Sequence, residues 1–275
     1  MAFKPDQELQ KFLDEDLGNG DITSKLLEKR KITAKIITKQ ETVVAGVNFV
    51  KQIFSLKKCR ATIIKKNGAK IKPNQVILEI RGDASDVLSC ERTALNLLSR
   101  MCGIATKTNQ LNAIIKKTNS KTKLLATRKT APGLRYFDKI AVEIGGGERH
   151  RMTLNDMIMF KDNHLAVENS IHILIGKARK TKRKIEIEVE NQKDAILAAT
   201  LGVNIIMLDN FTPHQITNTI KRLDELKLRK KVKIEASGRI NEKNISNYAK
   251  TGVDMISVGE ITHSPQGIDV SLEIN

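Results

Sequence analysis

The sequence predicts a mixed α/β protein whose second half is an α/β barrel, and three observations support this class. From residue 123 onward, short β-rich runs alternate with segments of helix length. Two segments, LGVNIIMLDN and TGVDMISVGE, repeat one pattern 50 residues apart. Charged residues or glycine turns follow most of the β-rich runs, and in barrels the C-terminal ends of the strands carry the active site.

The first half of the chain is predicted to form a smaller unit of strands and helices. Residues 31–47, 61–66 and 68–80 are strand-like, with a turn at Pro73-Asn74. We expect a first domain at residues 1–110 and a barrel domain at residues 111–267. The tail, residues 268–275, could pack back on the first domain.

A helix is predicted over residues 85–101. Its apolar side chains fall on one stripe at helical spacing, Ser85 or Asp86 can cap the start, and Gly103 is expected to end it. Glu91 lies inside the stripe and Arg92 at its edge, where an unpaired buried charge would cost several kcal/mol. An internal ion pair would explain both charges, and so would a subunit interface or a ligand contact.

Six candidate strands follow, with candidate helices between them. The strands are expected at residues 123–127, 156–160, 185–189, 204–208, 232–236 and 254–258. Thr212 and Gln215 have the spacing of a capping box, while Asn191 and Asn241 are expected to open two further helices. Strands and helices in this alternation predict parallel strands joined by right-handed crossovers.

Chemistry-bearing residues follow these strands. They are, in chain order, Arg128 and Lys129, Lys161 and Asp162, Glu188 and Glu190, Asp209 and Asn210, Glu235, Ser237 and Gly238, and Gly259. Because the C-terminal ends of parallel strands meet at one mouth of a barrel, we expect a cationic half to face a half with carboxylates and glycine turns.

The residue types at this mouth suit a sugar phosphate and an acidic co-substrate. The segment 127–164 alone contains seven Lys/Arg, two His and a Gly-Gly-Gly turn. Arg128, Arg151 and Lys161 provide donors for carboxylates or phosphates. Glycine turns before a helix can hold phosphate through backbone N–H groups. Glu188 and Asp209 could hold Mg²⁺ or sugar hydroxyls.

Several of these residues have a plain structural interpretation. Glu186, Glu188 and Glu190 alternate along one strand and could simply line a polar barrel interior. His150 and His164 could be ordinary hydrogen-bonded histidines, and His164 could serve only to brace its loop.

Composition limits the classes of function. The chain has 275 residues and a net charge of +17, which raises the question of nucleic acid. Aromatic residues are only 3% of the chain, with no Trp, so platforms for stacking bases are few and nucleic acid is not expected as a partner. No apolar run is long enough to span a membrane, and three cysteines without CxxC spacing suggest reduced thiols in a cytoplasmic protein.

Several motifs in the same order resemble the quinolinate phosphoribosyltransferase family. They are ERTALNLLSRMCGIAT, TRKTAPGLRYFDKIAVEIGGG, HRMTLNDMIMFKDNH, IEIEVEN, IMLDNF, EASGRI and ISVGEITHS. The resemblance implies an N-terminal α/β sandwich domain and an open, incomplete barrel of about seven strands. It also implies that quinolinate and phosphoribosyl pyrophosphate react, with Mg²⁺, to give nicotinate mononucleotide, carbon dioxide and pyrophosphate in NAD biosynthesis.

The resemblance further implies roles for individual residues. Arg92 would reach the neighbouring subunit's site in a homodimer or hexamer. Arg128, His150 and Arg151 would hold the quinolinate carboxylates, while Lys129 and Lys161 would serve the substrate acids and pyrophosphate. Glu188 and Asp209 would hold the ribose hydroxyls and, through the substrate, Mg²⁺. The 5′-phosphate would lie against the backbone of Ser237, Gly238 and Gly259.

Arg149 and Arg239 depart from the family's usual residues without removing any of these roles. Two relatives share the architecture, namely a protein of molybdate-transport operons and the nicotinate phosphoribosyltransferases, which do not decarboxylate. A nucleic-acid-binding module is the alternative from a different class, and retention of Arg92, His150 and Arg151 favours a diacid substrate.

Overall fold

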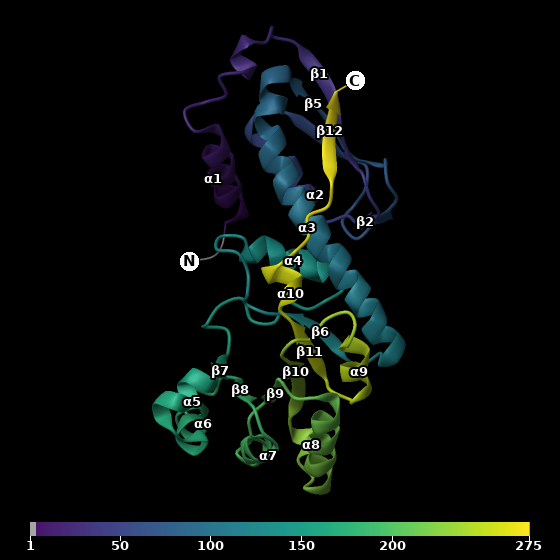
Figure 1. The fold of residues 1–275 in the computed structure, drawn as a ribbon. Coiled ribbons are helices and arrows are strands. Elements are labelled where there is room, and N and C mark those ends of the chain that lie inside the picture. The colour runs from purple at the N-terminus through teal and green to yellow at the C-terminus, as the bar shows by residue number, and fades with distance from the viewer. Residues whose placement is uncertain (1–3, 275) are drawn as a thin grey trace. The chain divides into compact units, whose positions relative to one another are not determined.

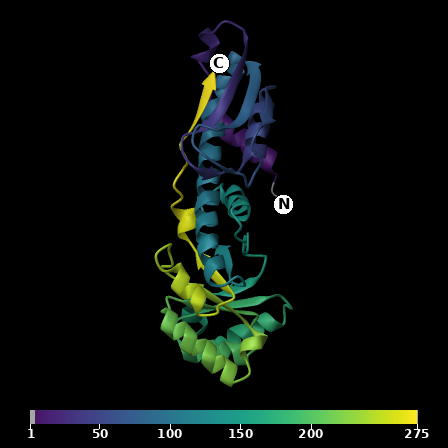
Figure 2. The same cartoon turned by 90° about the vertical axis from the view of Figure 1, so that its right-hand side faces the viewer.

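The computed structural model describes residues 4–274, so residues 1–3 of the expected first domain and residue 275 of the tail lie outside it. The chain divides into two compact units (Figures 1 and 2). The first contains the residues up to Asn109, Ala131–Gly146 and the residues from Ser264 onward, and the second contains Gln110–Thr130 and Gly147–His263.

The first unit has a four-stranded antiparallel sheet in the order β12-β1-β5-β3 and a separate pair, β2-β4. The bounds of these strands are β1 Lys31–Thr38, β2 Thr42–Val43, β3 Arg60–Ile63, β4 Lys70–Ile71, β5 Val76–Asp83 and β12 Val270–Ile274. The tail therefore packs against the first strand of the chain, with Ala34 opposite Ile274 and Thr38 opposite Val270, as Figure 1 shows for β12 and β1.

The helices of the first unit bury apolar residues between one another and the sheet. They are α1 Pro5–Leu17, α2 Val47–Leu56, α4 Arg135–Ile144, the short 3₁₀ helix Ser24–Leu26 and the part of α3, Ala84–Thr118, up to Asn109. Phe137 of α4 is fully buried, and its ring packs edge-on against Phe49 of α2. This contact holds the segment Ala131–Gly146 in the first unit, whereas we expected the segment within the barrel.

Helix α3, Ala84–Thr118, is much longer than predicted. Gly103 does not end it, and the prediction of a C-terminal cap there is wrong. A Cβ built on Gly103 would lie only 1.9 Å from the carbonyl oxygen of Gln266. The glycine therefore allows another segment of the backbone to approach the side of a continuous helix.

The second unit contains a parallel sheet of six strands in the order β6-β11-β10-β9-β8-β7. Their bounds are β6 Lys123–Ala126, β7 Ile158–Phe160, β8 Ile185–Val189, β9 Ile205–Asp209, β10 Lys233–Ser237 and β11 Met255–Val258. All six agree with the predicted strands to within two residues. The barrel is open, because β6 and β7 lie at opposite edges and do not pair.

A seventh strand, which the family resemblance implied, is absent among residues 4–274. Beside β6 there is only an isolated bridge, in which Ala126 N donates to Glu148 O at 3.0 Å and Glu148 N donates to Leu124 O at 2.8 Å. Gly145, Gly146 and Gly147 precede this bridge, and glycine weakens a strand because its backbone loses the most freedom on folding.

The helices that alternate with these strands are α5 Asp162–Glu168, α6 Ile171–Arg179, α7 Gln192–Thr200, α8 Pro213–Glu225, α9 Ile245–Lys250 and α10 Glu260–His263, with a 3₁₀ turn at Arg229–Lys231. The capping box of Thr212 and Gln215 and the Asn191 cap are confirmed. Asn241 is not a helix cap, because α9 begins only at Ile245, after a turn in which Asn241 N donates to Asn244 Oδ1.

Candidate active site

A cavity of about 300 Å³ opens at the C-terminal ends of the strands of the second unit. Eight of the predicted residues line it: Arg128, Lys129, His150, Arg151, Lys161, Glu188, Asp209 and Ser237. A second cavity, of about 430 Å³, shares Lys129, Asp209 and Ser237 with the first and adds Gly238 and Gly259. The convergence of these residues, and in particular of Arg151 and Asp209, is the arrangement that the strand ends predicted.

Two guanidinium groups lie at one wall of the first cavity. Arg151 is only 8% exposed, and burial together with the charge of Arg128 lowers its pKa. The Nε of Arg128 is buried, and within the described residues it has no hydrogen-bond partner. Two neighbouring cations withdrawn from water repel each other, and an anionic ligand would relieve that repulsion.

Two carboxylates lie on neighbouring strands of the same cavity. Glu188 on β8 forms an ion pair with Lys161 Nζ, which fixes one of its oxygens. Asp209 at the end of β9 accepts a hydrogen bond from Asn210 Nδ2 at 2.6 Å. The strands β8 and β9 pair in parallel, with Glu188 opposite Met207, so both carboxylates reach one space. Hard oxygen donors in this position suit Mg²⁺ held mainly through a substrate, because Lys161 already occupies one of the oxygens.

The turn after β10 brings bare backbone to the second cavity. Gly238 and Arg239 have positive φ values of 96° and 50°. A Cβ on Gly238 would lie 2.6 Å from the backbone nitrogen of Asn210, so only glycine fits there. Gly259 begins a second turn, in which its carbonyl accepts from Thr262 N and His263 N at 3.0 Å each. Turns of this kind can present N–H groups to a phosphate.

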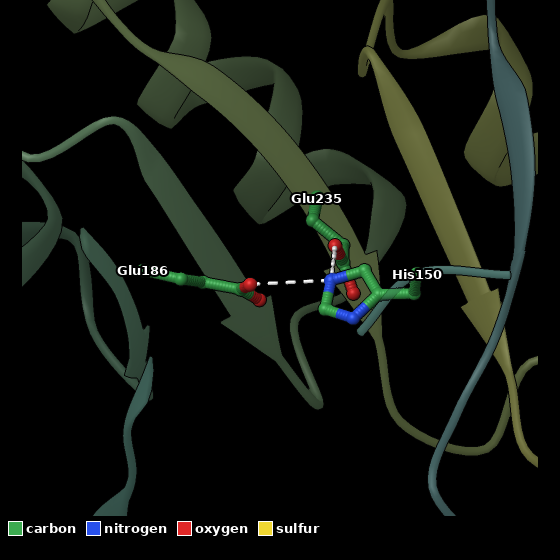
Figure 3. A group of neighbouring side chains, drawn as sticks. All are labelled: His150, Glu186 and Glu235. Atoms are coloured by element: carbon green, nitrogen blue, oxygen red, sulfur yellow. Dashed lines mark ion pairs between the residues drawn. The ribbon is translucent and has the colours of Figure 1, made fainter. Parts of the chain in front are cut away.

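His150 forms a buried group with two glutamates, a contact that the sequence did not predict (Figure 3). Its Nε2 lies 3.2 Å from Glu186 Oε2, on β8, and 3.5 Å from Glu235 Oε2, on β10. Both glutamates are fully buried. Burial alone would lower the pKa of His150, but its close approach to the two carboxylates outweighs this and raises the pKa to about 9. Burial and the neighbouring Glu235 raise the pKa of Glu186.

The three glutamates that alternate along β8 and just beyond it thus have three different environments. Glu186 is buried beside His150, Glu188 lines the cavity, and Glu190 is exposed and lines neither cavity. His164 braces its loop, as its plain interpretation predicted, because its Nδ1 accepts a hydrogen bond from Lys161 N at 3.1 Å.

Glu235, which was expected at the end of its strand, lines the first cavity, two positions before Ser237 on β10. Other residues of the cavities were missed from the sequence. His263 lies one helical turn after Gly259, and its Cδ2 would be 3.2 Å from a Cβ on that glycine. The strands also contribute Met159, Met207 and Ser257, which offered no signal beyond their place on a strand.

Arg92 and the cysteines lie outside both cavities. Arg92 is exposed on the part of α3 that belongs to the first unit, and within residues 4–274 neither it nor Glu91 forms an ion pair. Cys59, Cys90 and Cys102 are free and buried, and burial raises the pKa of Cys59 to about 11 and those of Cys90 and Cys102 to about 12. Such thiols are poor nucleophiles.

No helix among the described residues is long and apolar enough to cross a membrane. A cavity of about 550 Å³ in the first unit contains none of the predicted site residues. The fold and the two cavities of the second unit therefore define an open-barrel enzyme class, in which strand ends carry cations, carboxylates and glycine turns that suit anionic substrates.

Comparison with known proteins specifies the family. Residues 21–102 match the N-terminal domain of quinolinate phosphoribosyl transferase, and residues 104–273 match its C-terminal domain. The chain belongs to the quinolinate phosphoribosyl transferase family. Its similarity to curated relatives extends over nearly the whole of both chains.

A probable nicotinate-nucleotide pyrophosphorylase [carboxylating] of Archaeoglobus fulgidus is 44% identical over 93% of this chain and 98% of its own. The solved nicotinate-nucleotide pyrophosphorylase of Francisella tularensis is 36% identical, with a TM-score of 0.91 over 100% of this chain and 98% of that one. Human nicotinic acid phosphoribosyltransferase, at 12% identity and a TM-score of 0.59 over 100% of this chain and 75% of its own, shares the fold alone.

Proposed function

We propose that this enzyme transfers the phosphoribosyl group of phosphoribosyl pyrophosphate to quinolinate, giving nicotinate mononucleotide, carbon dioxide and pyrophosphate for NAD biosynthesis. Membership of the family across residues 21–273 supports this reaction. The single observation that supports it most directly is the convergence of Arg128, His150 and Arg151 with Glu188 and Asp209 on one cavity. Three cations suit a diacid, and the two carboxylates suit a sugar.

The reaction needs charge stabilisation more than a covalent nucleophile. The ring nitrogen of quinolinate forms a bond to the anomeric carbon of the ribose, and the bond from that carbon to pyrophosphate breaks, with the electron pair leaving on pyrophosphate. Positive charge that develops on the sugar is stabilised by Glu188 and Asp209, while Lys129 and Lys161 stabilise the leaving group.

Loss of carbon dioxide follows from the positive charge on the ring. The bond between the ring and the carboxylate next to the nitrogen breaks, carbon dioxide leaves, and the electron pair stays on the ring carbon, which then takes a proton. In this proposal Arg128, His150 and Arg151 orient the two carboxylates of quinolinate before attack, so binding energy is used for positioning.

We propose Mg²⁺ as the cofactor, held by Glu188 and Asp209 largely through the substrate. When bound, it offsets the negative charge of the pyrophosphate group. Their oxygen donors fit this ion, and the 5′-phosphate is held nearby by the turns at Ser237, Gly238 and Gly259.

We also propose that the enzyme is at least a homodimer in which Arg92 reaches the neighbouring subunit's site. The exposure of Arg92 on α3, without an ion pair in the described part of the chain, supports this. Arg92→Ala mixed with Lys161→Ala should regain part of the activity that each variant lacks alone, because some mixed dimers contain one intact site. No recovery after subunit exchange, verified by native mass spectrometry, would contradict the proposal.

The reaction is tested with quinolinate labelled with ¹⁴C in the carboxylate next to the ring nitrogen. With phosphoribosyl pyrophosphate and Mg²⁺ we expect equal amounts of labelled carbon dioxide and nicotinate mononucleotide. A parallel reaction with nicotinate should give little product, since it lacks one of the two carboxylates. Turnover of nicotinate without any release of label from quinolinate would instead favour a nicotinate phosphoribosyltransferase.

A further inference from the structure

Glu186 and Glu235 are buried charges for which the proposed reaction has no direct use. Both are fully buried, and among the described residues neither oxygen of Glu186 nor Oε2 of Glu235 accepts a hydrogen bond. Glu235 Oε1 does accept one, from Ser257 Oγ. A carboxylate removed from water costs several kcal/mol unless a partner compensates it, and the partner that both glutamates approach is His150.

The geometry fixes the ring of His150 through a single atom. Both ion pairs end on Nε2, as the two dashed lines of Figure 3 show, so the other ring nitrogen takes part in neither. Glu186 and Glu235 come from β8 and β10, the strands on either side of β9, and they approach Nε2 from two directions. The backbone of His150 is also unusual, with φ at 53°, a conformation that costs about 1–2 kcal/mol for a residue other than glycine.

The charges favour the protonated ring. An imidazolium has an N–H on both nitrogens, so Nε2 can form the ion pairs with the glutamates while the other N–H remains available to a ligand. His150 also lines the cavity that contains Arg128 and Arg151. Two carboxylates behind it offset the repulsion among these three cations before an anionic substrate arrives, and Glu186 attracts Arg151 as well. The raised pKa of His150 agrees with this arrangement.

We propose that Glu186 and Glu235 are positioning residues that orient His150 and hold it as a cation, so that its free edge binds a carboxylate of the diacid substrate. This inference rests on the proposed function only in the identity of the ligand. A divalent metal ion is the competing occupant, because the three ligand atoms lie within 4.8 Å of one another. This metal ion is disfavoured, because it would add two positive charges beside a cavity already lined by Arg128, Lys129, Arg151 and Lys161.

The first experiment compares Glu186→Gln and Glu235→Gln with Glu190→Gln, which removes an exposed charge just beyond the same strand as Glu186. In each of the two buried variants we expect the KM for quinolinate to rise by about ten- to a hundredfold, as for the loss of a charged hydrogen bond. The KM for phosphoribosyl pyrophosphate should stay within about twofold, and Glu190→Gln should behave like the wild type. Equal changes in both KM values, or no change, would overturn the positioning role.

The second experiment needs no turnover and therefore separates this inference from the proposed function. Side-chain ¹⁵N NMR of histidine-labelled protein, with the His150 signal assigned by its loss in His150→Gln, reports the charge of the ring at pH 8. We expect an imidazolium in the wild type and a neutral ring in Glu186→Gln. A neutral ring in the wild type would refute the inference even if neither glutamine variant folds.

Metal analysis of the same purified protein decides between the two occupants. The inference predicts no stoichiometric transition metal in the wild-type protein, whether or not a chelator was present during purification. One metal ion per chain that is lost in Glu186→Gln would identify the cluster as a metal site and overturn the inference.

Discussion

Arg128 and Arg151 bring two guanidinium groups to one cavity, and each should contribute to binding rather than to folding. We predict that Arg128→Ala lowers kcat/KM for quinolinate by about ten- to a hundredfold, because a charge-assisted hydrogen bond contributes about 1.5–3 kcal/mol. Steady-state kinetics with both substrates measures the effect. Lys180→Ala, which removes one positive charge from an exposed position, is the control. An unchanged kcat/KM in Arg128→Ala would contradict a role in the carboxylate clamp.

His150 should also make the stability of the protein depend on pH. Its pKa is about 9 in the folded protein and about 6.5 when the chain is unfolded, so the folded state binds this proton more tightly. The stabilisation is therefore complete below pH 6.5 and is lost as the pH rises through 9. At most it amounts to about 3 kcal/mol.

Urea unfolding at pH 6.5, 8 and 10 measures this contribution when the wild type is compared with His150→Gln. We expect the difference in unfolding free energy between the two proteins to shrink as the pH rises. If the difference stays constant across this range, the ring does not carry an extra proton in the folded state.

At the level of the elements, the strands were more predictable than the long helix. Six β-rich runs gave six strands because apolar side chains and turn residues mark both of their ends. Gly103 misled the prediction, since a glycine after an apolar stripe has the local signature of a helix end. A glycine is needed at this position because the carbonyl of Gln266 lies beside it, and Gln266 belongs to a segment far away in sequence.

In the site, too, contacts between segments far apart in sequence could not be predicted. Residues at the end of a strand or directly after it were found from the sequence, since their position is fixed by the strand alone. The contact of Glu186 and Glu235 with His150 was missed, because it joins two strands on either side of β9 to a residue from a loop. No local pattern around His150 indicates which carboxylates will face it.

Two glycines in helices give a matched test of the explanation for Gly103. Gly103→Ala should destabilise the protein by about 1–3 kcal/mol, because the new methyl group would overlap the backbone at Gln266. Gly176→Ala, within α6, meets no atom within 4 Å and should stabilise the protein by about 0.5–1 kcal/mol. Thermal and urea unfolding of both variants check the opposite signs. Equal effects would show that the approach at Gly103 is not tight.

Across the whole molecule, β12 completes a sheet whose other strands come from the beginning of the chain. A chain shortened to residue 267 loses the five paired positions from Ala34 to Thr38 and exposes the buried edge of β1. We predict a lower melting temperature, measured by calorimetry, with the second unit's strands retained in the circular dichroism spectrum. Glu273→Gln removes the charge of an exposed pair with Lys39 and should leave the melting temperature unchanged.

The same pairing has a consequence for how the protein is made. During synthesis on the ribosome, β1 emerges early, but its partner β12 emerges only after all of the second unit has been translated. Until then one edge of the first sheet has unsatisfied backbone groups that can pair with other nascent chains. The sheet of the first unit can therefore be completed only after the strands of the second unit have been made.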